Sequence, residues 1–187
     1  MLRKEDGNYL IRIAKKAINE YIINNTKIDV PKDCPEYLKE KLGVFVTLNE
    51  SKNLRGCIGY PEPIEPLIKA VIDVSISAAT ADPRFPKLTE DELSKIEIEV
   101  TVLTKPKIIQ VSDPNEYPKK IAIGEDGLII EKGFNKGLLL PQVATEHGMD
   151  SEEFLSNTCM KAGLDYSCWL NSDVKISSFQ GQIFKES

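Results

Sequence analysis

The chain has 187 residues, of which 41% are hydrophobic and 28% are charged, and it carries a formal net charge of −5 at neutral pH. A chain of this length fits one globular domain that buries about 70% of its unfolded surface. The acidic balance argues against non-specific nucleic-acid binding, which depends on Lys and Arg contacts to phosphates. We expect a cytoplasmic protein that does not enter membranes, because the first residues lack a secretory h-region and no apolar run approaches the roughly 18 residues of a membrane span.

The four cysteines are irregularly spaced, at Cys34, Cys57, Cys159 and Cys168. None of them forms a C-x-x-C pair, so the sequence has neither a zinc knuckle nor a redox dithiol motif. Without a secretory signal, we expect reduced thiols. The sequence therefore predicts no metal site and no cofactor.

The first half of the chain predicts a helix followed by a β-hairpin. Residues 8–24 carry apolar side chains at intervals of three and four, which is typical of an amphipathic helix that covers a core. Residues 43–48 are rich in β-branched and aromatic side chains and predict a strand. After turn chemistry at residues 49–53, we expect residues 54–58 to return antiparallel to that strand.

A second helix and a strand complete this half. Two prolines, Pro63 and Pro66, precede an apolar stripe that predicts a helix ending near Ala81. After a loop, Thr89 and Glu92 have the spacing of a capping box that opens a short helix. Residues 96–102 then alternate strictly between apolar and polar, which predicts a strand with one buried face.

The second half has shorter signals. Residues 113–120 indicate a short helix or a loop, and three short strands at 121–123, 128–131 and 138–140 predict a small β-meander. Ser151 is the expected N-cap of a helix that stops at Gly163, and residues 174–184 predict a final strand. Hairpins interspersed with unevenly spaced helices, without regular βαβ crossovers, indicate an α+β fold.

The heptapeptide Leu54-Arg55-Gly56-Cys57-Ile58-Gly59-Tyr60 resembles the central motif of the AMMECR-one (AMMECR1) family. The resemblance continues through Asp-Pro-Arg-Phe-Pro at 82–86 and Leu-Pro-Gln-Val at 140–143, and it spans nearly the whole chain. It implies one domain over residues 1–187, with an antiparallel sheet covered by helices and a smaller β-rich sub-lobe. We expect about residues 106–150 to contribute that sub-lobe. The family has no settled biochemical activity, so the resemblance implies no particular reaction.

Cys57 is the candidate nucleophile or thiol ligand, because a thiolate reacts readily where a cation or backbone N–H groups stabilise it. In a regular strand, Arg55 would project from the same face as Cys57 and could bind an anionic group. Gly56 would let a ligand approach the main chain. The alternative is that the glycines mark a bulge or a tight backbone contact and that Cys57 is a small buried hydrophobe.

Four further side chains are candidates. Asp82 and Arg84 could place a charge pair beside the hairpin as ligand-binding groups, or they could form an ion pair that anchors their loop. His147 is the sole histidine, so any cysteine–histidine pair must use it. Glu146 fits the family pattern better than His147 and is a candidate general base or polar ligand.

Two hypotheses of different classes follow. The first is a small-molecule-binding or enzymatic cleft around the motif at 54–60. The alternative is a non-catalytic interaction module that docks a partner protein or a ribonucleoprotein. The sequence leaves open whether the protein is an enzyme.

Overall fold

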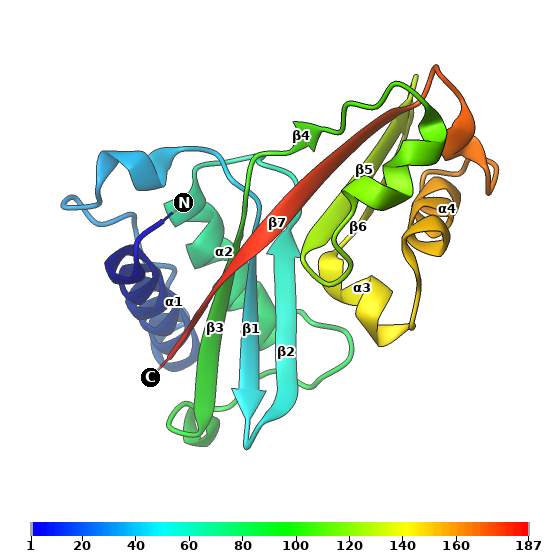
Figure 1. Cartoon of the computed structure of the whole chain (residues 1–187). Coiled ribbons are helices and arrows are strands. Elements are labelled where there is room, and N and C mark those ends of the chain that lie inside the picture. Colours follow the sequence, from blue (N-terminus) through cyan, green and yellow to red (C-terminus); the bar gives the residue numbers. More distant parts are fainter. Residues whose placement is uncertain (1, 187) are drawn as a thin grey trace. The chain divides into compact units, whose positions relative to one another are not determined.

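The computed structural model describes residues 2–186, which divide into two compact units (Figure 1). Unit 1 takes in the chain up to Leu103 and from Gln182 onward, and unit 2 runs from Thr104 to Gly181. The α+β class predicted from the sequence is confirmed. None of the helices among the described residues is long and apolar enough to cross a membrane.

Unit 1 is a three-stranded antiparallel sheet, ordered β2-β1-β3, with two helices on one of its faces. Its elements are α1 (Lys4–Asn24), the 3-10 helix η1 (Glu36–Lys39), β1 (Val44–Glu50), β2 (Asn53–Tyr60), α2 (Leu67–Thr80), the 3-10 helix η2 (Glu90–Glu92) and β3 (Ile96–Leu103). The last residues of β7 (Lys175–Lys185) also belong to this unit, where Phe184 packs against the core and the Glu186 N–H donates to the Ile98 carbonyl.

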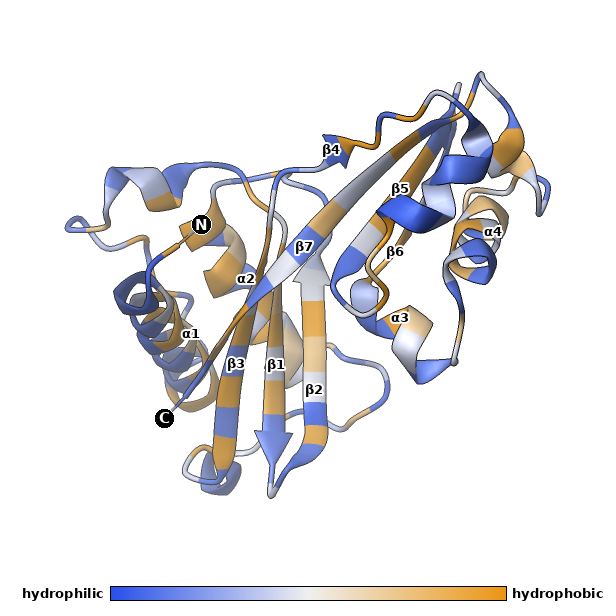
Figure 2. Cartoon of the chain, in the orientation of Figure 1, coloured by the Kyte–Doolittle hydropathy of each residue, from blue (hydrophilic) through white to orange (hydrophobic). Residues whose placement is uncertain are grey.

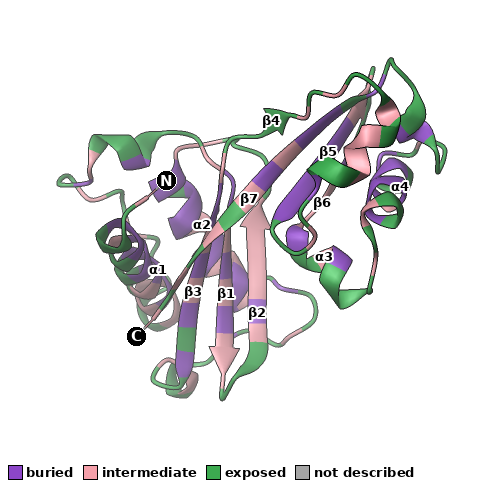
Figure 3. Cartoon of the chain, viewed as in Figure 1, coloured by how far each residue is buried: buried purple, intermediate pink, exposed green. Residues whose placement is uncertain are grey.

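The core of unit 1 follows from the alternation of its strands. Val44, Val46 and Leu48 of β1 are fully buried toward the helices, whereas Phe45 and Thr47 between them are half-buried on the opposite face. β3 alternates in the same way, and its hydropathy stripes are visible in Figure 2. The small and apolar side chains of α2 pack against β1 and β2, and Figure 3 shows buried residues on α2 and alternating along β1 and β3.

Unit 2 contains three antiparallel strands in the order β7-β5-β6, with β4 also paired to β7. Its elements are β4 (Lys107–Ile108), the 3-10 helix η3 (Pro114–Lys120), β5 (Asp126–Lys132), β6 (Asn135–Leu139), α3 (Pro141–Glu146), α4 (Ser151–Lys161), the 3-10 helix η4 (Cys168–Leu170) and most of β7. α4 packs on β5 and β6, and Phe154, Leu155 and Trp169 join Leu128 and Ile130 in a separate core.

Several local predictions for unit 2 were wrong. Residues 121–123 form no strand, because the Ala122 N–H donates to the Asp126 carboxylate and closes a turn there. The N-cap of α4 is Asp150 rather than Ser151, and its carboxylate accepts from the N–H groups of Glu152 and Glu153. The helix α3 was not predicted, although Pro141 occupies its first turn, where proline is favoured.

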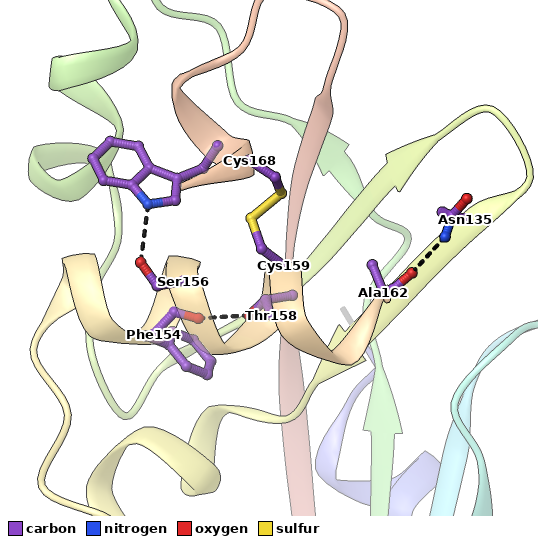
Figure 4. The surroundings of a disulfide bond; sticks show 8 residues. Asn135, Phe154, Ser156, Thr158, Cys159, Ala162 and Cys168 are labelled. Atoms are coloured by element: carbon purple, nitrogen blue, oxygen red, sulfur yellow. Dashed lines mark hydrogen bonds between the residues drawn. A yellow bond between two sulfur atoms is a disulfide. The ribbon is translucent and has the colours of Figure 1, made fainter. Parts of the chain in front are cut away.

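The expectation of reduced thiols is wrong for Cys159 and Cys168, which form a disulfide within unit 2 (Figure 4). Gly163, with a φ of +72°, reverses the chain after α4 and allows the η4 turn to lie back on that helix. The two Cα atoms thereby come within 5.8 Å of each other. Cys34 and Cys57, both in unit 1, are free thiols.

Candidate functional site

The cysteine motif lies on β2, the edge strand of unit 1, as the hairpin pattern predicted. The strand is not regular, however. Leu48 pairs with Gly56 and Asn49 pairs with Leu54, so Arg55 has no partner residue in β1 and forms a bulge. The register needed for Arg55 and Cys57 to project side by side from a regular strand is therefore absent.

Asp82 and Arg84 clamp the main chain of Cys57. The Cys57 N–H donates to Asp82 Oδ2 at 2.8 Å, and Arg84 Nη2 donates to the Cys57 carbonyl at 3.2 Å. The two side chains also bind each other, with Arg84 Nε 3.0 Å from Oδ1 and Nη2 2.8 Å from Oδ2 of Asp82. Together they satisfy the outward N–H and C=O of Cys57 in the way that a neighbouring strand would.

Arg55 fastens the same loop at a second point. Its guanidinium donates from Nε to Glu92 Oε1 at 2.7 Å and from Nη2 to Glu92 Oε2 at 3.1 Å. Its Nη1 donates to the Pro86 carbonyl at 3.0 Å. The Arg55 and Glu92 side chains are 11% and 18% exposed, so this bidentate pair is largely shielded from water.

These pairs set the protonation of the two carboxylates. Hydrogen bonds from Arg84 hold the pKa of Asp82 far below its usual range, although burial acts in the opposite direction. Hydrogen bonds from Arg55 likewise lower the pKa of Glu92 to about 2. Both carboxylates are therefore ionised at neutral pH, and their low pKa values make them weak bases. A general base works best with a pKa near the working pH, so neither carboxylate is suited to that role.

The two glycines of the motif make room for the fold itself. A Cβ on Gly56 would lie 2.2 Å from the Ala78 carbonyl oxygen at the end of α2, and one on Gly59 would lie 2.3 Å from the Phe45 ring. These distances are well inside van der Waals contact, so a side chain at either position would force β2 away from its neighbours. Close packing thus accounts for both glycines.

The Cys57 thiol is half-buried and accepts a hydrogen bond from Thr47 Oγ1, with the oxygen and sulfur 3.3 Å apart. Thr47 faces Cys57 across the hairpin and Glu99 across β1–β3. Because Val46 and Leu48 point toward the helices, these three side chains lie on the other face of the sheet. We call this surface, with Phe45, Ile183 and Lys185, the open face.

The sequence reasoning missed Thr47 and Glu92. Glu92 had been predicted only as the capping-box partner of Thr89, and it does fill that role, accepting from the Thr89 N–H at 2.8 Å. Its second role, as the partner of Arg55, joins residues 37 positions apart and leaves no local pattern. Asp82 and Arg84, by contrast, were predicted as a pair, and the structure brings them together with Cys57.

Glu146 and His147 belong to unit 2, where both side chains are exposed. Glu146 is the last residue of α3 and His147 is its C-cap, with its N–H donating to the Val143 carbonyl. Across residues 2–186, His, Cys, Asp and Glu side chains form no group of three or more that could hold a metal ion.

Comparison with known proteins shows what the chain is similar to. The chain matches the AMMECR1 family model over residues 11–184. A protein of Methanothermobacter thermautotrophicus is 51% identical over 185 residues, covering 99% of this chain and 96% of its own. Protein PF1979 of Pyrococcus furiosus is 52% identical over 190 residues, covering 99% and 90% of the two chains.

One solved structure is also similar. The crystal structure of the uncharacterized protein PH0010 from Pyrococcus horikoshii has 49% sequence identity and a TM-score of 0.82, with 100% of this chain and 94% of the other covered. These likenesses extend over both units and include the cysteine motif.

Proposed function

Because the chain belongs to the AMMECR1 family, whose model covers the cysteine motif and both units, we propose that this motif carries the function, as part of a module that binds a partner protein without catalysing a reaction. The observation that carries the proposal is the state of the charges around Cys57. Arg55 and Arg84 are each engaged by a carboxylate, and both carboxylates have strongly lowered pKa values.

A catalytic role for these four side chains would require breaking an ion pair first. Asp82 would have to release two guanidinium nitrogens and the Cys57 N–H before it could accept a proton. Arg55 would have to leave Glu92 and the Pro86 carbonyl before it could bind an anionic ligand. The same contacts suit a binding surface, because they hold β2 and the 82–92 loop in one geometry before a partner arrives.

The open face, and not the edge of β2, is the surface we propose for docking. The clamp already occupies the outward backbone groups of Cys57, which blocks the addition of another strand at that point. The open face offers Phe45 and the 55% exposed Ile183 as apolar contacts. Thr47 of β1 and Cys57 of β2, which are paired across the two strands, add neutral polar groups. An apolar centre with neutral polar neighbours is typical of protein interfaces.

A partner protein fits this face better than a ribonucleoprotein. The cation of Lys185 is paired with Glu99 at 3.0 Å, and that of Arg84 is paired with Asp82. Nucleic-acid contacts draw their affinity from cations that are free to replace counterions at phosphates. Lys185 on the open face and Arg84 in the neighbouring clamp therefore both lack the free cation that is the strongest element of RNA recognition.

A thiol enzyme is the second candidate. The observation that favours it is the free, half-buried thiol of Cys57. The Thr47 hydroxyl donates to its sulfur, and the Arg84 guanidinium donates to the Cys57 carbonyl. In that mechanism Cys57 would be the nucleophile.

Alkylation with iodoacetamide separates the two candidates, with Cys34 as an internal reference. Burial raises the pKa of Cys34, which should react slowly. A binding module predicts that Cys57 is alkylated slowly at neutral pH. The enzyme predicts that Cys57 is alkylated rapidly at neutral pH, well ahead of Cys34. That second result would overturn the binding proposal.

Photocrosslinking tests docking directly. A benzophenone attached to Cys57 in a Cys34→Ser background should crosslink one partner in a saturable manner, and unlabelled chain should compete while a Phe45→Asp chain should not. The matched control carries the probe at Lys16→Cys on the exposed side of α1, with Cys57→Ser. Equal crosslinking from both positions would contradict docking at the open face.

A further inference from the structure

The segment from Gly163 to Val174, which we call loop 163–174, joins α4 to β7 in unit 2 and buries little of itself. Cys168, Trp169 and Val174 are its buried side chains, and Leu164 is half-buried. The remaining side chains, including the large ones of Tyr166 and Leu170, are exposed. Trp169 and its buried neighbours therefore join the core of unit 2, whereas the exposed stretches between them gain little free energy from apolar contacts.

The N–H groups of Gly163 and Leu164 donate to the Met160 and Cys159 carbonyls at the end of α4, and the backbone hydrogen bonds further along close on the loop itself. The Cys168 N–H donates to the Asp165 carbonyl, and the Leu170 N–H donates to the Ser167 carbonyl. The Val174 N–H, in turn, donates to the Asn171 carbonyl. These bonds, from Cys168 onward, shape local turns and do not connect that part of the loop to α4.

Two side-chain links connect the middle of the loop to α4. Trp169 Nε1 donates to Ser156 Oγ at 3.0 Å, and the disulfide joins Cys168 to Cys159 one turn further along the helix (Figure 4). An exposed ion pair between Lys132 and Asp173 adds a contact to β5, of a kind that contributes little to stability. The covalent bond is therefore the strongest attachment between the loop and the helix.

We propose that the Cys159–Cys168 disulfide is a redox-sensitive lock, and that a dithiol reductant opens it to release loop 163–174 and Trp169 from α4 while unit 1 keeps its fold. One thiolate of the reductant attacks a cysteine sulfur, the S–S bond breaks, and the other cysteine leaves as a thiolate that takes up a proton. The second thiol of the reductant then releases the first cysteine and closes the reductant's own disulfide. Two electrons and two protons pass to the protein.

The burial of the sulfur atoms adds a kinetic feature. Cys159 and Cys168 are 0% and 2% exposed, so a reductant reaches them only when the loop opens. The lock should therefore open slowly in the folded protein, at a rate that reports the opening of loop 163–174.

Hydrogen exchange of the folded chain, with and without dithiothreitol, tests the lock. Intact mass first establishes that reduction adds two hydrogen atoms. After reduction, amides of loop 163–174 should exchange roughly 30-fold faster, the equivalent of losing a typical disulfide constraint, while those of β1 and β3 should be unchanged. The emission of Trp169, the single tryptophan, should shift to longer wavelength as its ring becomes solvated.

Two variants serve as controls. Cys34→Ser/Cys57→Ser keeps the disulfide and should respond to dithiothreitol as the parent does. Cys159→Ser/Cys168→Ser should show the fast loop exchange without reductant, and if it fails to fold, the reduced parent chain decides. Four free thiols in protein purified without reductant would overturn the lock, as would unchanged loop exchange after reduction or equal loss of protection in β1 and β3.

Discussion

Each unit fastens one irregular segment to its sheet or helix, and the two use different chemistry. In unit 1, the 82–92 loop is held against β2 by the Asp82–Arg84 clamp and the Arg55–Glu92 pair. In unit 2, loop 163–174 is held to α4 by a disulfide. Both segments bury a few apolar side chains, Leu88 in the first and Trp169 in the second, and the polar or covalent links hold the exposed remainder in place.

The difference determines what each unit responds to. Ion pairs and charge-assisted hydrogen bonds weaken when their carboxylates are protonated, whereas they are indifferent to reductants. A disulfide has the opposite sensitivities. Acid should therefore destabilise the attached segment of unit 1, and reduction should release that of unit 2. The predictions below test whether the two segments differ in this way.

Removing Asp82 should have the largest effect. Asp82→Ala leaves the Cys57 N–H without its acceptor and Arg84 without its carboxylate, at a side chain that is only 2% exposed. We expect a loss of about 3 kcal/mol in the free energy of unfolding, because removing one partner of a buried pair leaves the other unsatisfied. Urea denaturation followed by far-UV circular dichroism measures the loss, with exposed Asp29→Ala as the matched control.

The location of that loss matters as much as its size. Hydrogen exchange should show the lost protection in β2 and the 82–92 loop, with α4 unaffected. An equal loss of protection around Trp169 would mean that the two units are not fastened independently.

Acid should affect unit 1 through Glu92. The folded pKa of about 2 lies below the ordinary glutamate value of 4.5, so the carboxylate contributes its full stability above about pH 4.5 and loses that contribution as the pH falls toward 2. The contribution is about 2–3 kcal/mol at most. Asp82 has a lowered pKa as well and loses stability in the same direction.

The Glu92→Gln variant isolates this effect. Its unfolding free energy should be lower than that of the parent at pH 7, and the difference should shrink as the pH is lowered from 4.5 to 2. Asp113, an exposed carboxylate of unit 2 whose pKa is lowered by the Asn115 N–H, provides the matched comparison. Asp113→Asn should change the pH dependence much less, because an exposed cap is well solvated in both states.

The sequence predicted the elements whose pattern is local. The helix-spaced apolar residues of α1, the alternation of β3 and the capping box at Thr89 each depend on neighbours within a few positions, so their elements were recovered with boundaries a few residues off. The motif on β2 was placed correctly on a hairpin strand for the same reason, because turn chemistry separates it from β1.

What the sequence did not reveal depends on contacts between distant residues. The bulge at Arg55 and its pairing with Glu92 require the 82–92 loop to return to β2. The disulfide requires the reversal at Gly163 to bring η4 back onto α4. The residue types of Arg55 and Cys57 alone predict an anion-binding group and a nucleophile. Only the folded structure shows that the Arg55 guanidinium is already bound to Glu92.

The smallest of these effects concerns Gly56, and it decides between two readings of the motif. If the glycine exists for packing, Gly56→Ala should cost about 2 kcal/mol, because its Cβ would lie 2.2 Å from the Ala78 carbonyl and β2 must shift. The control is Gly148→Ala in unit 2, where the site is open and only the φ of +62° opposes a side chain, at about 1 kcal/mol. Urea denaturation measures the stability of the variant, and the Cys57 crosslinking assay measures its binding. If Gly56→Ala left the stability unchanged but abolished crosslinking to the partner, this glycine would instead serve the approach of a ligand.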